Sequence, residues 1–376
     1  MRNIARWLGA FLLAAPFAAA GPARAQVVYG TPPEIETGFV MTGWTLEQGD
    51  RKVTVRQVVA PLSGFLPLRD NAELRYFLAR GSSQAEVDGD VHRLSGLSDL
   101  RFQFNRSLAQ DRVFLALGLN LPTGKRGLDL ESEWLVSHYL SQDFLSIPLR
   151  RLGAGLGLSF MAGGAVERGP FLLGATVAYE IAGAYESYAG IDDYDPGDQF
   201  NLSLRAETTR DGARAWAGFT YADYTGDTVD GVLVYDQNWY ARTSLGVEKS
   251  TRHLRLETHG SYLVRDGATT YDEAGAALNN LRLYGNELYW SISGAWLGGR
   301  QERPWHLGPV AAWRLIDGNE YGTGRAAVLT LGVDGGFCVS SRIRAGLGLR
   351  LYTGDAAGGG LDLSGYQTSL TVVGNL

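Results

Sequence analysis

The sequence contains little of what several classes of protein require. Its 376 residues include one cysteine, Cys338, which excludes a disulfide framework and any zinc or iron–sulfur site built on cysteine ligands. The five histidines are scattered, so they do not form the cluster that a three-histidine zinc site needs. Beyond the N-terminal segment no apolar run reaches the roughly 20 residues of a membrane helix, which excludes an α-helical inner-membrane protein. The 50 glycines and the 11% aromatic content favour strands and turns.

The first 25 residues have the organisation of an export signal. Arg2 and Arg6 form a basic start, an apolar stretch follows, and residues 23–25 read Ala-Arg-Ala, a small-x-small cleavage site. We therefore expect a cleaved signal peptide over 1–25 and a short periplasmic segment over 26–37; an uncleaved N-terminal anchor is the alternative. Cleavage removes three arginines and no acids, which changes the formal charge from −6 to about −9 and argues against a nucleic-acid partner.

The rest of the chain, residues 38–376, alternates apolar and polar residues with the period of a strand that has two different faces. Within 287–297, for example, one face carries Leu288, Trp290 and Ile292, and the other carries polar residues. Such runs last about 10–13 residues, whereas strands of soluble sandwiches average about 5–6 and a tilted membrane crossing needs about 9–11. Because an open sheet edge in hydrocarbon leaves backbone groups unpaired, these strands must close into a barrel.

Short polar connections give an independent strand count. They recur near Asn71, Ala109, Arg168, Asp211, Ser250, Gln301 and Ser340. Outer-membrane barrels place short turns and both termini on the periplasmic side and long loops outside. The sequence thus predicts an all-β fold, a transmembrane antiparallel up-and-down β-barrel of about 16 strands running from residues 38–48 to residues 365–376. Pro61 and Pro67 interrupt the second strand, and if the N-terminal 80 residues form a plug or an irregular edge, the count falls to 14.

The last strand carries a signal of its own. Tyr366, Thr368, Leu370 and Val372 share one face, which continues to Leu376 at the C-terminus. This pattern resembles the C-terminal assembly signal of outer-membrane proteins, which usually ends in phenylalanine. We therefore expect contact with the barrel-assembly machinery through this strand, outer-membrane lipids around the barrel, and localisation in the outer membrane of a Gram-negative bacterium.

Charged residues on the polar faces of the strands would face the lumen of the barrel. The lumen-lining candidates are Arg101, Arg205, Glu207, Arg255, Glu257, His259, Glu287, Arg342, Arg344 and Arg350. Unpaired charge in a protein interior is costly, so these groups must be hydrated or paired with one another. They would line a water-filled channel, or they would rigidify a closed, plugged or narrow barrel; the sequence fits both interpretations.

Catalytic and metal chemistry have little support in the sequence. His259 has Glu257 and Ser261 two residues away on the same strand face, where side chains can touch, so a barrel lipid hydrolase is one alternative. Such groups fill any barrel lumen, and we expect no catalytic residues. Residues 192–195 and Asp198 are acidic enough to bind calcium, but a solvated loop has the same composition. We expect no metal site and no cofactor.

Longer connections alternate with the short turns. We expect them at residues 122–148, 184–199, 225–236, 266–285 and 354–364. The first of these places Leu128, Leu135 and Tyr139 at helical spacing before a stop at Pro148. A short amphipathic helix there would lie on the membrane, cap the pore, form an apolar entry site or pack within the loop.

Residues 97–179 resemble a known group of exported barrels. The stretch 99–105, the pair Asp111-Arg112 and the run Leu-Asn-Leu-Pro-Thr-Gly-Lys at 119–125 are similar to barrels of the fatty-acid-transporter type. They are particularly similar to the outer-membrane protein group of the phenol meta-degradation pathway. The resemblance implies a barrel that passes hydrophobic small molecules inward, and it implies no particular substrate-binding residues. The Asn-Pro-Ala hatch element of the fatty-acid transporters is absent from this sequence.

Together these features predict a barrel for the passive passage or uptake of small molecules, with hydrophobic or aromatic solutes as one class of candidates. The export signal, the alternating strands and the charged lumen rows support this prediction. Two alternatives stay open, namely a structural or surface-interaction barrel that does not transport, and the barrel lipid hydrolase.

Overall fold

The computed structural model describes residues 32–69, 71–188, 193–272, 274–282, 285–300, 303–319 and 324–375. The predicted signal peptide, 1–25, and the first half of the predicted periplasmic segment, 26–31, lie outside these ranges, so both stay predictions. In the described part of the chain, no helix combines the length and the apolar character that a membrane crossing requires.

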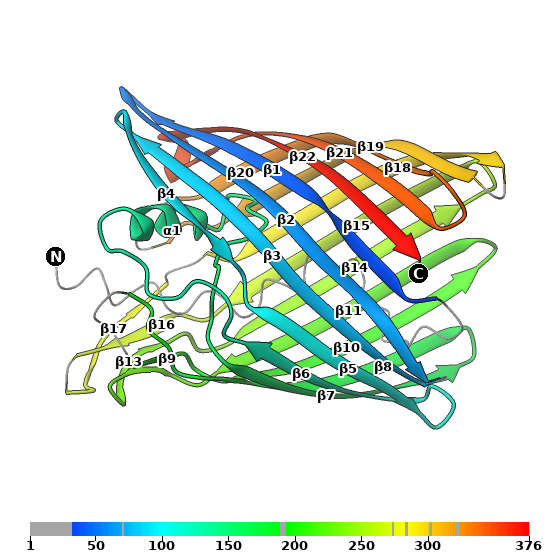
Figure 1. The fold of residues 1–376 in the computed structure, drawn as a ribbon, viewed down its shortest axis with the longest axis horizontal. Coiled ribbons are helices and arrows are strands. Elements are labelled where there is room, and N and C mark those ends of the chain that lie inside the picture. Colours follow the sequence, from blue (N-terminus) through cyan, green and yellow to red (C-terminus); the bar gives the residue numbers. More distant parts are fainter. Residues whose placement is uncertain are drawn as a thin grey trace.

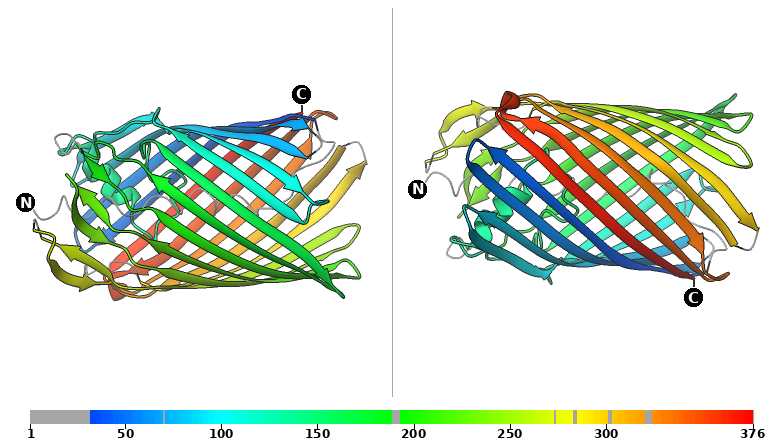
Figure 2. Two further views of the ribbon diagram at one scale, coloured as in Figure 1. Left: turned by 90° about the horizontal axis from the view of Figure 1, so that it is seen from below. Right: turned by 90° about the horizontal axis from the view of Figure 1, so that it is seen from above.

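The strands form one closed antiparallel sheet (Figures 1 and 2). Its members are β1 (Glu34–Gln48), β2 (Arg51–Arg69), β3 (Ala72–Val87), β4 (Asp90–Leu97), β5 (Leu100–Leu108), β6 (Val113–Leu121), β7 (Gly157–Arg168), β8 (Phe171–Ala182), β10 (Gln199–Arg210), β11 (Ala213–Tyr224), β14 (Tyr240–Ser250), β15 (Leu254–Arg265), β18 (Glu287–Arg300), β19 (Arg303–Ile316), β20 (Ala326–Cys338), β21 (Ile343–Ala356) and β22 (Leu361–Asn375). These 17 strands make 16 crossings of the wall within the described ranges, because β4 and β5 follow each other and both pair with β3. The sheet closes where β1 pairs with β22. The predicted barrel and its larger strand count are therefore confirmed.

The outside of the wall is apolar. Leu347 is 56% exposed and Trp290 is 39% exposed, although both lie within regular strands. Trp296, in the last part of β18, and Trp305, in the first part of β19, are exposed as well. An apolar outer surface of this extent is stable only against hydrocarbon, so the barrel spans a membrane and its alternate residues face an enclosed lumen.

The described turns among those predicted from the sequence lie together at one end of the barrel, where the C-terminus also lies (Figure 1). The equally short turns between β1 and β2 and between β3 and β4 lie at the other end. The predicted turns near Asn71, Ala109, Arg168, Asp211, Ser250 and Ser340 each join consecutive strands as expected. The turn predicted near Gln301 falls on residues outside the described ranges. Between β10 and β11 the reversal uses Asp211 and Gly212 with φ of 49° and 72°, and Asp-Gly is a preferred sequence for this left-handed pair.

β2 continues through both of its prolines, so the alternative count of 14 strands is wrong. The pairing of β1 with β2 lapses beside Pro61, which has no N–H to donate. The carbonyl oxygen of Pro61 accepts a hydrogen bond from the Thr37 hydroxyl at 3.0 Å. The register with β3 shifts between Pro67 and Arg69. A strand tolerates proline at such irregular points.

The two strands that close the barrel are longer than predicted. β1 begins at Glu34 instead of residue 38, and β22 begins at Leu361 instead of residue 365. Glu34 pairs with residues of both neighbouring strands, β2 and β22. The residues added at the start of β1 therefore form backbone hydrogen bonds with both neighbouring strands. The alternation of side chains in the sequence does not show how far this pairing extends.

Most long connections lie at the opposite end of the barrel, where five short strands form a second sheet. They are β9 (Tyr194–Asp195), β12 (Asp227–Val229), β13 (Val232–Asp236), β16 (Ala268–Tyr271) and β17 (Ala277–Leu281). The long connection predicted at 354–364 is wrong. β21 and β22 occupy most of it and are joined by the short 3-10 turn η2 (Ala357–Gly359), whose residues have positive φ and reverse the chain tightly.

Candidate functional site

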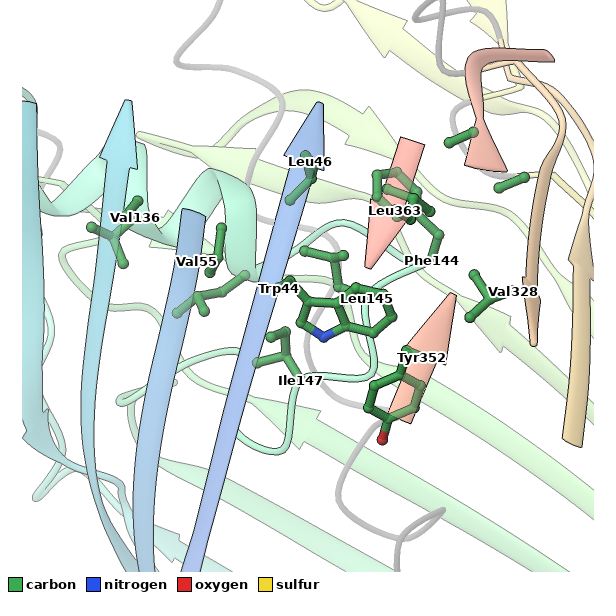
Figure 3. Packing of buried hydrophobic residues seen from close by; sticks show 14 of the residues in the cluster. Trp44, Leu46, Val55, Val136, Phe144, Leu145, Ile147, Val328, Tyr352 and Leu363 are labelled. Atoms are coloured by element: carbon green, nitrogen blue, oxygen red, sulfur yellow. The ribbon is translucent and has the colours of Figure 1, made fainter. Parts of the chain in front are cut away.

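The connection between β6 and β7, residues 122–156, folds into the mouth of the barrel (Figures 1 and 3). We call it the inserted segment. It contains α1 (Glu133–Leu140), whose Val136 and Leu140 are buried. Side chains alternate between the two faces of a strand. Phe39 of β1 is exposed on the lipid side, so Trp44, five residues later, points into the lumen. Side chains of the segment, including Phe144, pack against Trp44 and other lumen-facing residues of β1–β4 and β19–β22.

The helix predicted within 122–148 is thus present, and it packs on the inner wall of the barrel instead of lying on the membrane. Local contacts close its first turn, because the Asp129 carboxylate accepts a hydrogen bond from the Ser132 N–H at 3.0 Å and the Glu133 carboxylate accepts one from the Asp129 N–H at 3.2 Å. In its last turn His138 stacks on Trp134, four residues earlier, with ring centroids 5.6 Å apart.

Asp99 holds both ends of the inserted segment. It lies between β4 and β5 and is 2% exposed. Its carboxylate accepts hydrogen bonds from the backbone N–H groups of Gly124 at 2.7 Å and Ala154 at 2.6 Å, and from the Asn120 amide at 3.0 Å. Its own N–H donates to the carbonyl oxygen of Leu152 at 3.0 Å. The inserted segment is therefore attached to the wall at the interruption between β4 and β5.

A second anchor joins the inserted segment to β2. The side-chain amide of Gln57, which is buried, donates to the carbonyl oxygen of Leu149 at 2.6 Å and accepts from the Leu149 N–H at 3.0 Å. The Gln57 side chain therefore makes the same pair of hydrogen bonds to the Leu149 backbone that a neighbouring strand would make. The same amide donates to the Ser83 hydroxyl at 2.9 Å. Close approach requires glycine in β3, because a Cβ on Gly81 would lie 2.8 Å from the Leu149 side chain.

A charged cluster lies where the inserted segment meets the opposite wall. Asp143 of the segment is 3.8 Å from Arg265 of β15. Arg314 of β19 donates to Glu287 of β18 at 2.8 Å, and Arg265 lies 4.0 Å from the same carboxylate. The four side chains are only 8–18% exposed. The predicted lumen residue Glu287 thus belongs to a narrow charged zone at the height of the segment.

Toward the end with the short turns, the lumen wall is more accessible to water. Glu207 of β10 accepts two hydrogen bonds from Arg214 of β11, at 2.5 and 2.7 Å, and lies 3.4 Å from Arg205. Arg255 of β15 is 3.8 Å from Glu248 of β14. Arg205 is 38% and Arg255 is 52% exposed. The predicted lumen residue Glu207 thus forms a tight pair with Arg214, and the predicted lumen residues Arg205 and Arg255 form longer ion pairs on a wall that water can reach.

Two further predicted lumen residues lie on other parts of the wall. Arg101 of β5 donates to the Asn120 side chain at 3.2 Å, beside the Asp99 anchor. Arg350 of β21 makes two hydrogen bonds of 2.6 Å to the carboxylate of Asp334 on β20. Such a bidentate pair fixes both side chains in the lumen.

The remaining charged candidates lie nearer the short turns. Arg344 of β21 forms a 2.5 Å ion pair with Glu34 of β1. Arg342 is exposed in the turn before β21 instead of within a strand. Glu257 lies directly opposite Glu248 in the pairing of β14 with β15. Among the described residues, no group of three or more histidine, cysteine, aspartate or glutamate side chains is arranged to hold a metal ion.

His259 lies on the same lumen wall, in an aromatic environment. Its ring centroid is 6.3 Å from that of Trp216 and 6.0 Å from that of Tyr289. In a hydrolase His259 would be the base, Ser261 the nucleophile and Glu257 the acid that orients the base. Within the described ranges, no hydrogen bond joins His259 to Ser261 or to Glu257, so this arrangement is not formed.

Reasoning from the sequence missed the residues that seat the inserted segment. Gln57 and Asp143 look like ordinary polar residues, and each finds its partner far away in the chain, Gln57 at a separation of 92 residues. The one local signal was available at Ser98 and Asp99, where the strand alternation is interrupted.

A buried cluster stabilises the long connections outside the wall. The Arg151 guanidinium lies 4.3 Å from the ring centroid of Tyr185. The Tyr194 hydroxyl donates to Asp227 at 2.6 Å, and the Gly197 N–H donates to the other oxygen at 2.8 Å. Burial raises the pKa of Asp227 to about 6, raises the pKa of Tyr194 well above its ordinary value and lowers the pKa of Arg151.

No family model and no curated protein matches the chain. Solved structures similar to it include OprB of Pseudomonas putida, with 10% identity over 91% of this chain and 94% of that chain and a TM-score of 0.48. OpdL of Pseudomonas aeruginosa has 11% identity over 92% and 98%, with a TM-score of 0.46. The translocator domain of the autotransporter NalP from Neisseria meningitidis has 12% identity over 92% and 89%, with a TM-score of 0.35. Similarities this low assign neither a family nor a function.

The geometry of the barrel itself defines the class. A closed antiparallel wall, an apolar outer face and a charged lumen together make this chain an outer-membrane β-barrel. The finer resemblance to the phenol meta-degradation group stays a prediction.

Proposed function

We propose that this barrel lets small molecules cross the outer membrane passively, without a catalytic residue or a cofactor. The observation that carries the proposal is the change in water access along the lumen. Arg255, toward the short turns, is 52% exposed, whereas Arg265, beside the inserted segment, is 17% exposed. A hydrated lumen that leads to a narrow charged zone is suited to diffusion with selection at the constriction.

Hydrophobic or aromatic small molecules are the solutes we propose. The resemblance of residues 97–179 to the phenol meta-degradation group supports this choice.

Planar-bilayer conductance and the swelling of liposomes that contain the purified barrel test the passage. We expect steady ionic currents and swelling with small solutes, in proportion to the amount of barrel inserted. Complete absence of current and of solute flux from correctly folded barrels would refute passive passage.

A surface-interaction barrel without transport is the second candidate. It is favoured by the second sheet, in which residues 277–280 of β17 have exposed side chains. Removal of the β16–β17 hairpin should then abolish binding of a partner and leave the ionic current unchanged. Loss of current without loss of partner binding would speak against this candidate.

We also propose that β22 is the strand that the barrel-assembly machinery contacts, with membrane lipids as the later surroundings of its outer face. The alternation of β22 supports this, since Leu370 pairs with the lipid-facing Leu347 and so belongs to the outer row. The terminal Leu376 lies outside the described residues.

A further inference from the structure

Three aromatic side chains follow one another on the lumen wall. Trp216 of β11, His259 of β15 and Tyr289 of β18 belong to lumen-facing rows and are partly exposed. The rings of Trp216 and His259 are 6.3 Å apart with planes inclined by 17°, and those of His259 and Tyr289 are 6.0 Å apart with planes inclined by 53°. We call these three residues the aromatic row.

The aromatic row connects the hydrated part of the lumen with the narrow zone. Trp216 lies three residues after the start of β11, close to the end with the short turns. Tyr289 pairs with Arg314, a member of the charged cluster beside the inserted segment. A solute that moves through the lumen therefore meets the three rings in succession.

A glycine makes the row possible. β14 lies between β11 and β15, and its residue opposite both Trp216 and His259 is Gly246. A Cβ at Gly246 would lie 2.0 Å from Cζ2 of the indole. Only glycine therefore lets the indole lie over β14, where it reaches the imidazole on the next strand.

Arginine side chains surround the row. The guanidinium carbons of Arg205 and Arg214 each lie 5.7 Å from the ring centroid of Trp216, within the range of a cation–π contact. Arg205 and Arg242 act electrostatically on His259, and Glu257 is the carboxylate that opposes them. Guanidinium groups and the carboxylates of Glu207 and Glu257 thus both lie beside the row.

Two of these guanidinium groups have capacity for another anion. Arg205 is 38% exposed, and its ion pair with Glu207 is 3.4 Å long. The Nε of Arg242 is buried and has no hydrogen-bond partner within the described part of the chain. Because guanidinium groups bind carboxylates strongly, a carboxylate in the lumen would gain from contact with the exposed parts of these two partly exposed side chains.

We propose that the aromatic row binds planar aromatic carboxylates as they pass through the lumen. The ring of such a solute stacks on the exposed faces of Trp216, His259 and Tyr289, and its carboxylate approaches Arg205 and Arg242. The inference rests on the proposed passage of small molecules and specifies the class of solute.

Benzoate and cyclohexanecarboxylate are the probes, since both are monoanions with six-membered rings and only benzoate is planar. Their dissociation constants are measured by titration of the purified full-length barrel in detergent, which requires no flux. We expect tighter binding of benzoate, and a weakening of about fivefold in Trp216→Leu, as expected for the loss of one stacking contact. Trp216→Tyr, which keeps a ring, should retain most of the affinity.

Trp305→Leu is the matched control, because Trp305 lies on the lipid-facing side and is 44% exposed. Arg205→Gln should weaken benzoate and leave the neutral benzyl alcohol unaffected. Folding of each variant is checked by circular dichroism, and His259→Leu replaces Trp216→Leu if the latter does not fold. Equal affinities for the two acids, or equal effects of the ring variant and of Trp305→Leu, would overturn the inference.

The outcomes separate this inference from the proposed passage. Benzoate binding that depends on Trp216 in a barrel without current supports the aromatic row and contradicts passive passage. Current in a barrel whose benzoate binding does not depend on Trp216 contradicts the aromatic row and supports passage.

Discussion

Asp99 carries an unusual number of contacts for one residue of a barrel wall. Its carboxylate binds the two ends of the inserted segment through Gly124 and Ala154, and the Asn120 amide completes its hydrogen bonds. A buried carboxylate is costly unless it is well paired, and here three donors point at it. The attachment of both ends of the segment therefore depends on this one side chain, whereas Gln57 and the buried apolar contacts hold its middle.

Replacement of Asp99 by alanine should release the inserted segment. The change leaves three donors unpaired, and each buried unpaired donor costs about 1–3 kcal/mol, so the two ends of the segment near Gly124 and Ala154 should detach from the wall. We expect faster proteolysis within residues 122–156 and a larger single-channel conductance than in the wild type.

The control for this variant is Asp90→Ala, since Asp90 is exposed at the start of β4. It should leave the cleavage rate and the conductance unchanged. Identical cleavage of the two variants would show that the Asp99 contacts do not hold the segment.

At the scale of elements, the hairpin of β12 and β13 depends on a buried acid. Burial raises the pKa of Asp227 from 3.8 to about 6, so the folded state favours the protonated carboxyl. This stabilisation is complete below about pH 3.8 and is lost as the pH rises through about 6. From these two values it amounts to about 3 kcal/mol at most.

The second sheet should accordingly open more readily at neutral pH than at pH 4.5. Hydrogen exchange of the β12 and β13 amides, corrected for its intrinsic pH dependence, measures this opening. Asp227→Asn should remove most of the difference, because the amide does not ionise. Asp230→Asn, at an exposed position in the same hairpin, should keep it. A pH response that survives in Asp227→Asn would assign the effect to another group.

For the molecule as a whole, the decisive property is which side of the wall meets lipid. Leu349 of β21 is 45% exposed on the outer face, near the middle of its strand. Leu349→Arg should destabilise the barrel in lipid vesicles by about 2–4 kcal/mol, because a cation near the bilayer centre loses its hydration. Urea unfolding in vesicles measures the change.

Ser369→Arg is the matched comparison, since Ser369 is its neighbour on β22 and faces the lumen beside Gly348. Water and Asp334 are available there, so we expect a much smaller loss of stability. Similar losses in the two variants would mean that the outer face is not in contact with hydrocarbon.

The wall of the barrel could be predicted from the sequence because it depends on local patterns. The two-residue period assigns each side chain to one face of the sheet, as Leu347 and Trp290 show, and turn residues such as Asp211 and Gly212 mark the reversals. Sixteen crossings followed from the spacing of the turns. The prolines of β2 were misleading because β2 stays paired with β3 at Pro61, although its pairing with β1 lapses there.

The contents of the lumen were decided by tertiary structure alone. Gln57 meets Leu149 across 92 residues, and Asp99 meets Ala154 across 55, so no local period relates the partners. The stacking of Trp216 on His259 likewise requires that β11, β14 and β15 be neighbours. The local alternation of apolar and polar residues determines which face of a strand meets water. Closure of the barrel determines which lumen-facing side chains contact one another, because it encloses distant strands and the inserted segment around one lumen.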